Sequence, residues 1–225
     1  MIEHTAIGID GCRDGWIAAI REPDSQIRWQ FTESIRDFLG DFDKPMLALV
    51  DMIIGLPDAR QSSRECDRLA RKLLKPHGSR VFPAPPSEAL HAADYRTACE
   101  LARDGTGKAI SKQCWYLFPK IRELDALNDP RIRESHPELV FAKLNRGTPV
   151  SESKKTPGGQ KIRLDLLETA LPRSIEAYQA AVDQLPKVRY LLDDCIDALA
   201  LCVAARSPQS LTRLPTNPDL SGIWY

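Results

Sequence analysis

The first 51 residues constrain the fold more than any other part of the chain, because short apolar runs and turn signals alternate there at close spacing. Apolar runs at 5–10, 16–21 and 26–31 are separated by Gly11 to Gly15 and by Glu22 to Ser25. Short apolar stretches joined by tight turns are typical of consecutive antiparallel strands. The sequence therefore predicts a three-stranded meander at the start of the chain.

A short helix and a fourth strand are expected after the meander. Ile35 and Phe38 lie at helical spacing, and an apolar run at 46–50 ends at Asp51. The chain between them is long enough for one helical crossover, so the fourth strand is predicted to run parallel to the first. Ligands of open α/β sheets bind at the carboxyl ends of parallel strands. We therefore expect Asp10 and Asp51, at two such ends, to lie close enough to share a divalent cation.

The remaining chain reads as mostly helical. Residues 55–128 are predicted to be a helical insertion within a single domain that spans 1–225. Arg131 to Ser135 is expected to form a fifth strand that ends at Glu134, and Ser153 to Gly159 reads as a mobile basic loop. The predicted fold class is therefore α/β, with a mixed sheet of five strands, antiparallel and parallel, flanked by helices.

The most apolar helix expected in the chain, 190–206, also carries three acids. Asp193 and Asp194 are suited to cap this helix and to complement its dipole. Asp197 lies one turn further in and is followed by eight apolar residues. Because an unpaired carboxylate in such a place is costly, we interpret Asp197 as a functional residue.

Composition excludes several other classes of protein. The chain has 225 residues with 43% hydrophobic and 28% charged side chains, as ordinary globular proteins have. Its longest apolar run, 198–205, is far shorter than the roughly 20 residues of a membrane span. The first residues lack the pattern of a signal peptide, so we expect a cytoplasmic protein with no membrane partner. The six cysteines form no C-x-x-C pair and are expected to be reduced thiols.

The formal net charge of zero hides an asymmetry along the chain. Residues 1–60 carry 6 basic and 11 acidic residues, residues 61–163 carry 20 and 12, and residues 164–225 carry 5 and 8. An acidic frame around a basic middle suits a metal site beside a phosphate-binding surface, and equally suits helices of uneven charge. The basic residues assigned to substrate, each of which a solvated surface would also explain, are Arg64, Arg71, Lys112, Lys154 and Lys155.

Seven short motifs, taken together and in order, resemble the family called domain of unknown function 429. They are G-I-D-G-C-R-D-G-W (8–16), D-M-I-I-G-L-P (51–57), R-x-x-D-x-x-A-R (64–71), V-F-P-A-P (81–85), E-S-H-P-E (134–138), S-K-K-T (153–156) and D-x-x-D-A-L-A (194–200). This family is described as predicted nucleases with a ribonuclease-H-like fold, and the resemblance covers nearly the whole chain. It implies the same strand order that the apolar pattern predicts.

The resemblance also implies a metal site. In ribonuclease-H-like enzymes, three or four carboxylates hold two Mg²⁺ or Mn²⁺ ions, one activating water and the other stabilising the leaving oxygen. The last motif resembles the final helix of bacterial Holliday-junction resolvases, which places Asp194 and Asp197 beside Asp10. Asp37 is expected to be exposed, so Asp51 is favoured as the second acid. The candidate catalytic residues are Asp10, Asp51, Asp194, Asp197 and, unless it forms a surface salt bridge, Glu134; the first four are the candidate metal ligands.

The leading hypothesis is therefore a divalent-metal-dependent phosphodiester hydrolase, a nuclease, whose partner is a nucleic acid. One alternative is a non-catalytic nucleic-acid-binding or scaffold protein with the same fold. A second is an actin-like ATP phosphotransferase, whose phosphate loop also resembles G-I-D-G. The single G-I-D-G in this chain argues against that class, which binds ATP between two such domains. A homodimer is compatible with the sequence, since junction resolvases make two symmetric cuts.

Overall fold

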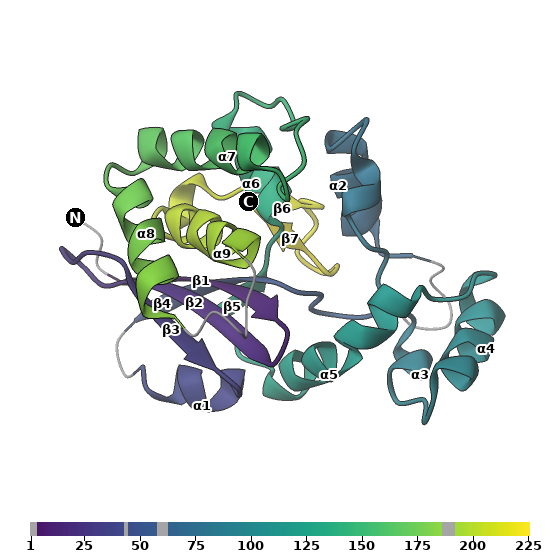
Figure 1. The fold of residues 1–225 in the computed structure, drawn as a ribbon. Helices are drawn as coiled ribbons and strands as arrows, with labels where there is room; N and C mark the ends of the chain where they lie inside the picture. The colour runs from purple at the N-terminus through teal and green to yellow at the C-terminus, as the bar shows by residue number, and fades with distance from the viewer. Residues whose placement is uncertain (1–3, 43–44, 58–62, 186–191) are drawn as a thin grey trace. The chain divides into compact units, whose positions relative to one another are not determined.

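The computed structural model describes residues 4–42, 45–57, 63–185 and 192–225 (Figure 1). The chain forms two compact units. The first contains Met1–Met52, Asp129–Arg213 and Trp224–Tyr225, and the second contains Ile53–Asn128 and Leu214–Ile223. The stretch predicted as a helical insertion falls within the second unit, and every acidic candidate falls within the first.

A five-stranded sheet with the strand order β3-β2-β1-β4-β5 forms the centre of the first unit. Strand β1 is antiparallel to β2, which is antiparallel to β3, whereas β4 runs parallel to both β1 and β5. The prediction of an α/β protein with a mixed sheet is confirmed, and the arrangement is consistent with a ribonuclease-H-like fold. The strands are β1 (Thr5–Cys12), β2 (Gly15–Arg21), β3 (Arg28–Thr32), β4 (Met46–Asp51) and β5 (Ile132–Glu134).

Helices cover both faces of this sheet (Figure 1). Helix α9 packs against β1, β2 and β4, and α6, α7 and α8 pack against α9. Helix α1 lies on the opposite face (Figure 1) and buries Ile35, Phe38 and Leu39. The first two residues of the predicted last helix, Tyr190 and Leu191, lie outside the described residues. The helices of this unit are α1 (Ile35–Gly40), α6 (Pro137–Leu144), α7 (Pro157–Ala170), α8 (Ser174–Gln184), α9 (Leu192–Ala205) and the 3₁₀ turn η2 (Pro208–Ser210).

Strand β1 alternates between the two faces, as the period of a strand requires. Ala6 joins the core cluster that includes the buried side of α9. Gly8 lies on the same face, and a Cβ atom there would stand 2.0 Å from the carbonyl oxygen of Ala198 and 2.1 Å from the amide nitrogen of Cys202. The absence of a side chain at Gly8 therefore allows the backbone of α9 to pack directly on β1.

The second unit is helical. Its elements are α2 (Glu65–Leu73), the 3₁₀ turn η1 (Gly78–Arg80), α3 (Ser87–Leu90), α4 (Tyr95–Thr106) and α5 (Lys112–Leu127). A two-stranded sheet of β6 (Arg213–Leu214) and β7 (Ile223–Trp224) joins segments near the end of the chain. Within the described parts of the chain, no helix is both long enough and apolar enough to span a membrane.

Candidate metal centre

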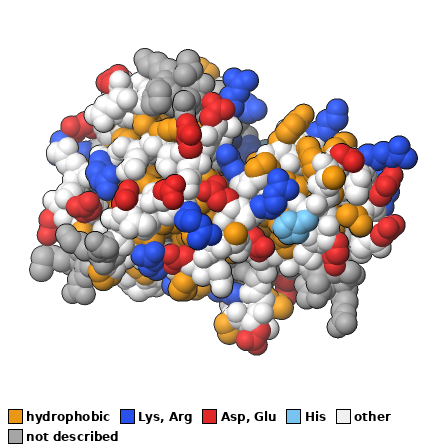
Figure 2. All heavy atoms as spheres, turned by 90° about the horizontal axis from the view of Figure 1, so that it is seen from below, with side chains coloured by type: hydrophobic (Ala, Val, Ile, Leu, Met, Phe, Trp, Pro, Cys, Tyr) orange, Lys and Arg blue, Asp and Glu red, His pale blue; other side chains and the backbone are white. Residues whose placement is uncertain are grey.

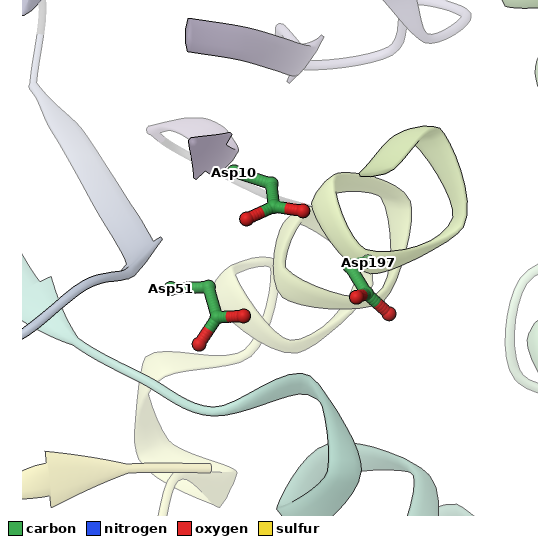
Figure 3. A group of neighbouring side chains, drawn as sticks. All are labelled: Asp10, Asp51 and Asp197. Carbon is green, nitrogen blue, oxygen red and sulfur yellow. The ribbon is translucent and has the colours of Figure 1, made fainter. Parts of the chain in front are cut away.

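Three carboxylates from distant parts of the sequence lie close together near the carboxyl ends of the inner strands β1 and β4. Asp10, Asp51 and Asp197 each offer one oxygen, and these oxygens all lie within 4.8 Å of one another. Figure 3 shows the three side chains, which extend from β1, β4 and α9. The expectation that Asp10 and Asp51 lie close together is confirmed, since they are direct partners in the parallel ladder of β1 and β4.

The alternation of the strands explains why these acids face the same helix. Asp10 follows Gly8 by two residues, and Asp51 follows Leu49, a member of the α9 core cluster, by two residues. Residues two apart lie on the same face of a strand, so both carboxylates point toward α9. Asp197 directly precedes Ala198, whose carbonyl oxygen approaches Gly8. The close packing at Gly8 thus brings the third acid to the other two.

Burial gives these acids unusual protonation behaviour. Asp10 is 6% exposed and Asp197 is 1% exposed. Burial, followed by the nearby charges of Asp51 and Asp197, raises the pKa of Asp10 well above its ordinary value. Burial raises the pKa of Asp197 to about 7, against the opposing effect of Lys154. Burial also raises the pKa of Asp51, although His136 and Lys154 act in the other direction.

One oxygen of the cluster is available to a ligand. Asp197 Oδ1 is buried and has no hydrogen-bond partner among the described residues. Buried polar atoms in proteins nearly always have a partner, so this oxygen requires an explanation. Carboxylate oxygens are the ligands that Mg²⁺ and Mn²⁺ prefer. A divalent cation between the three acids would satisfy Asp197 Oδ1 and relieve the repulsion between the carboxylates, so the residues present fit such an ion.

A lysine completes the cluster. The ammonium group of Lys154 forms an ion pair with Asp197 Oδ2 and lies 3.5 Å from Asp193 Oδ2. Burial acts to lower the pKa of Lys154, but the carboxylates of Asp197 and Asp10 raise it above its ordinary value. Lys154 is therefore a charged member of the site, and its side chain is 34% exposed.

The segment that carries Lys154 is fixed at its end by a helix cap. Thr156 caps α7 by accepting a hydrogen bond from the amide of Gly159 at 3.1 Å, and Pro157 is the first residue of the helix. The expected loop from Ser153 to Gly159 is thus a loop only up to Thr156. The prediction of a loop was wrong for residues 157–159, because it did not take into account that a threonine followed by proline is a favourable helix start.

A buried ion pair, which the sequence reading missed, supports the same segment. Arg163 Nη2 lies 2.7 and 3.0 Å from the two carboxylate oxygens of Glu138. Arg163 Nη1 donates to the carbonyl oxygens of Glu152 and Gly159 at 3.1 and 3.0 Å. This guanidinium therefore connects α6 to the residues on both sides of Lys154. The only signal of Glu138 in the sequence was its place in the E-S-H-P-E motif.

The comparison with known families settles where this chain belongs. The family model described as "Protein of unknown function (DUF429)" matches residues 8–220. The chain belongs to the DUF429 family. No curated protein and no solved structure matches the chain. That description names no activity. The nuclease activity that the resemblance implies for this DUF429 protein therefore depends on the geometry of the site.

The other acidic candidates of this DUF429 protein lie outside the group of three. Asp194 is half-buried in the first turn of α9, and its neighbour Asp193 is the one near Lys154. Glu134 is buried at the end of β5. Asp37 is exposed, as expected. The roles assigned to Asp194 and Glu134 stay predictions.

The basic candidates have different surroundings. Arg64 is 3% exposed, forms an ion pair with Asp67 at 2.5 Å and donates to the carbonyl oxygens of Ile54 and Gly55. Arg71 donates to the carbonyl oxygen of Val81 at 2.7 Å. Lys112 is exposed at the start of α5, and Lys155 is exposed beside Lys154. Their roles in substrate binding stay predictions.

Proposed function

We propose that this DUF429 protein is a divalent-metal-dependent phosphodiester hydrolase that cleaves nucleic acid. The observation that carries the proposal is the group of Asp10, Asp51 and Asp197, with oxygens within 4.8 Å of one another and a buried Asp197 Oδ1 that lacks a hydrogen-bond partner. An all-carboxylate site favours a hard cation, so Mg²⁺ or Mn²⁺ is the proposed cofactor.

The proposed reaction is the hydrolysis of a phosphodiester by side chains that the strands hold in fixed positions. In hydrolysis, a water oxygen bonds to phosphorus while one ester P–O bond breaks, and the leaving oxygen takes up a proton. Bound Mg²⁺ or Mn²⁺ would supply water activation and would neutralise charge on the phosphoryl oxygens. Asp51 is the last residue of β4, and Asp10 lies opposite it in the parallel ladder, two residues before the end of β1. Both carboxylates are therefore held in position before substrate arrives. Lys154 adds a positive charge beside them.

Nucleic acid is the proposed substrate because of the charge pattern and the family resemblance. The stretch 61–163 carries 20 basic and 12 acidic residues, and basic side chains supply most of the affinity for a phosphate backbone. On the face drawn in Figure 2, however, basic and acidic side chains are interspersed. A substrate screen should therefore include several nucleic-acid forms: single-stranded and duplex DNA, RNA, an RNA–DNA hybrid and a four-way junction.

Metal binding can be tested without knowledge of the substrate. Mn²⁺ is titrated by calorimetry into the wild-type protein, into Asp10→Asn and into the exposed control Asp37→Asn. We expect the wild-type protein and Asp37→Asn to bind the ion, whereas Asp10→Asn loses the binding because it removes a ligand oxygen and its charge. Asparagine has nearly the same shape and removes repulsion between buried acids, so this variant is expected to fold.

Cleavage is then measured on the nucleic-acid screen in Mn²⁺. Asp10→Asn is expected to reduce the rate by about 100-fold or more, since even the partners of metal ligands contribute 10–100-fold. Cleavage that survives in Asp10→Asn would contradict the proposal. Metal binding without cleavage of any nucleic acid would instead favour the non-catalytic binding or scaffold role.

A further inference from the structure

We infer that Lys154 takes the place of a second metal ion, so that the site binds one divalent cation and completes its charge with an internal ammonium group. The inference deepens the proposed function and rests on it for the identity of the site. It is carried by the different surroundings of the two oxygens of Asp197.

The inference assigns the two carboxylate oxygens of Asp197 to two different cations, Lys154 and the metal ion. Its Oδ2 forms the ion pair with Lys154, whereas its Oδ1 is buried and has no hydrogen-bond partner among the described residues. The oxygen available to a metal ion is therefore Oδ1, on the carboxylate that approaches Asp10 and Asp51. A second ion bound through Oδ2 would have to displace the ammonium group.

The charges of the cluster favour one ion. Asp10, Asp51 and Asp197 carry three negative charges when ionised, and one divalent ion together with the Lys154 ammonium group matches these three; Asp193 adds a fourth carboxylate beside the ammonium group. A second divalent ion would place two more positive charges beside Lys154, and like charges at such short range repel strongly. Asp193, at 3.5 Å from the Lys154 ammonium, provides a further contact that holds the lysine in place.

The backbone around Lys154 is also held in place. Arg163 donates to the carbonyl oxygen of Glu152, and the carbonyl oxygen of Ser153 accepts from the amide and the hydroxyl group of Thr156 at 3.0 and 2.9 Å. A Cβ atom on Gly159 would lie 2.0 Å from that same Ser153 oxygen, so α7 packs directly against the segment. The backbone on both sides of Lys154 is therefore fixed, and this holds its ammonium group beside Asp197.

The test is the number of Mn²⁺ ions bound per chain, measured by calorimetry. We expect one ion in the wild-type protein and two in Lys154→Met, which removes the internal cation, with the first ion binding about tenfold or more tightly because repulsion is lost. Lys154→Arg keeps the charge and is expected to bind one ion. Lys155→Met is the matched control, since Lys155 is the exposed neighbour, and it too is expected to bind one ion.

A second measurement does not depend on the folding of any variant. Wild-type protein is acetylated with and without Mn²⁺, and the labelling of Lys154 is compared by mass spectrometry with that of Lys155. If Lys154 stays in the site, Mn²⁺ does not increase the rate at which Lys154 is acetylated relative to Lys155. Displacement by metal would instead make Lys154 label faster.

The outcomes separate the two proposals. Two ions in the wild-type protein, with faster labelling of Lys154, would overturn the inference and leave the metal-dependent function standing. One ion in both the wild-type protein and Lys154→Met would also overturn it, because Lys154 would then not occupy a second cation site. If no ion binds to the wild-type protein, the proposed metal centre fails and the inference fails with it.

Discussion

The side chain of Arg163 has no exposed surface, so the carboxylate of Glu138, rather than water, compensates its positive charge. Removing one partner of a buried ion pair leaves the other charge without compensation, which costs about 3–5 kcal/mol. We predict that Arg163→Met lowers the free energy of unfolding by that amount, measured by urea denaturation. The double variant Glu138→Gln/Arg163→Met should recover part of the loss, since no charge is then left buried. A single variant within about 0.5 kcal/mol of the wild-type protein would contradict the prediction.

Arg64, in the second unit, also forms a buried ion pair, with Asp67. Because Arg64 is a substrate-binding candidate as well, its contributions to stability and to binding have to be separated. We predict that Arg64→Met lowers the free energy of unfolding by about 3–5 kcal/mol. The control Arg68→Met breaks an exposed pair with Glu65, which is worth about 0–1 kcal/mol. Thermal unfolding and nucleic-acid binding are measured on both variants. Weaker nucleic-acid binding by Arg64→Met with unchanged stability would show a substrate role rather than a structural one.

The packing of α9 on β1 is the contact between elements that brings Asp197 to Asp10 and Asp51. Gly8→Ala would introduce a Cβ atom 2.0 Å from the carbonyl oxygen of Ala198. Since backbone atoms cannot rotate away, we predict a loss of about 3 kcal/mol in the free energy of unfolding. The shift of α9 should also weaken Mn²⁺ binding, because Asp197 moves away from Asp10.

Gly40→Ala is the matched control for this prediction. Gly40 is the last residue of α1, and a Cβ atom there meets nothing within 4 Å. This variant is expected to be neutral or to stabilise the protein by up to about 1 kcal/mol, with unchanged Mn²⁺ binding. Equal effects of the two substitutions, measured by urea denaturation and calorimetry, would rule out the close contact at Gly8.

The elements also show which parts of the site were predictable from sequence. Alternation of side chains and the parallel crossover are local patterns, and they were enough to place Asp10 beside Asp51. Asp197 was recognisable because a carboxylate inside an apolar helix has no local explanation. The burial of Arg64 and Arg163 was not predictable, because a sequence shows the charge of a side chain but not whether it is solvated. The contact of Lys154 with Asp197 joins residues 43 positions apart, which no local pattern encodes.

At the scale of the whole molecule, the buried acids Asp10 and Asp197 and the partly buried Asp51 make stability depend on pH in an unusual direction. Burial raises the pKa of Asp10 and Asp51 above the ordinary value and that of Asp197 to about 7. As the pH rises from about 4 toward about 7, the unfolded chain releases protons that the folded chain still holds. The contribution of these acids to stability is therefore greatest at low pH and decreases over this range in metal-free protein.

A divalent ion should reverse this dependence, because the ion binds the ionised carboxylates and competes with the protons. In EDTA, we predict that the unfolding temperature falls between about pH 5 and about pH 7.5 through this contribution, and that Asp197→Asn, which lacks one of the titrating groups, shows a smaller fall. Mn²⁺ at about 100 times its dissociation constant should raise the unfolding temperature of the wild-type protein at about pH 7.5 by about 5–10 °C. At about pH 5 and the same Mn²⁺ concentration, the rise should be smaller, since protons then occupy the ligand oxygens. Scanning calorimetry at the two pH values measures both effects, and an equal rise at both would show that these carboxyl groups are not the ligands.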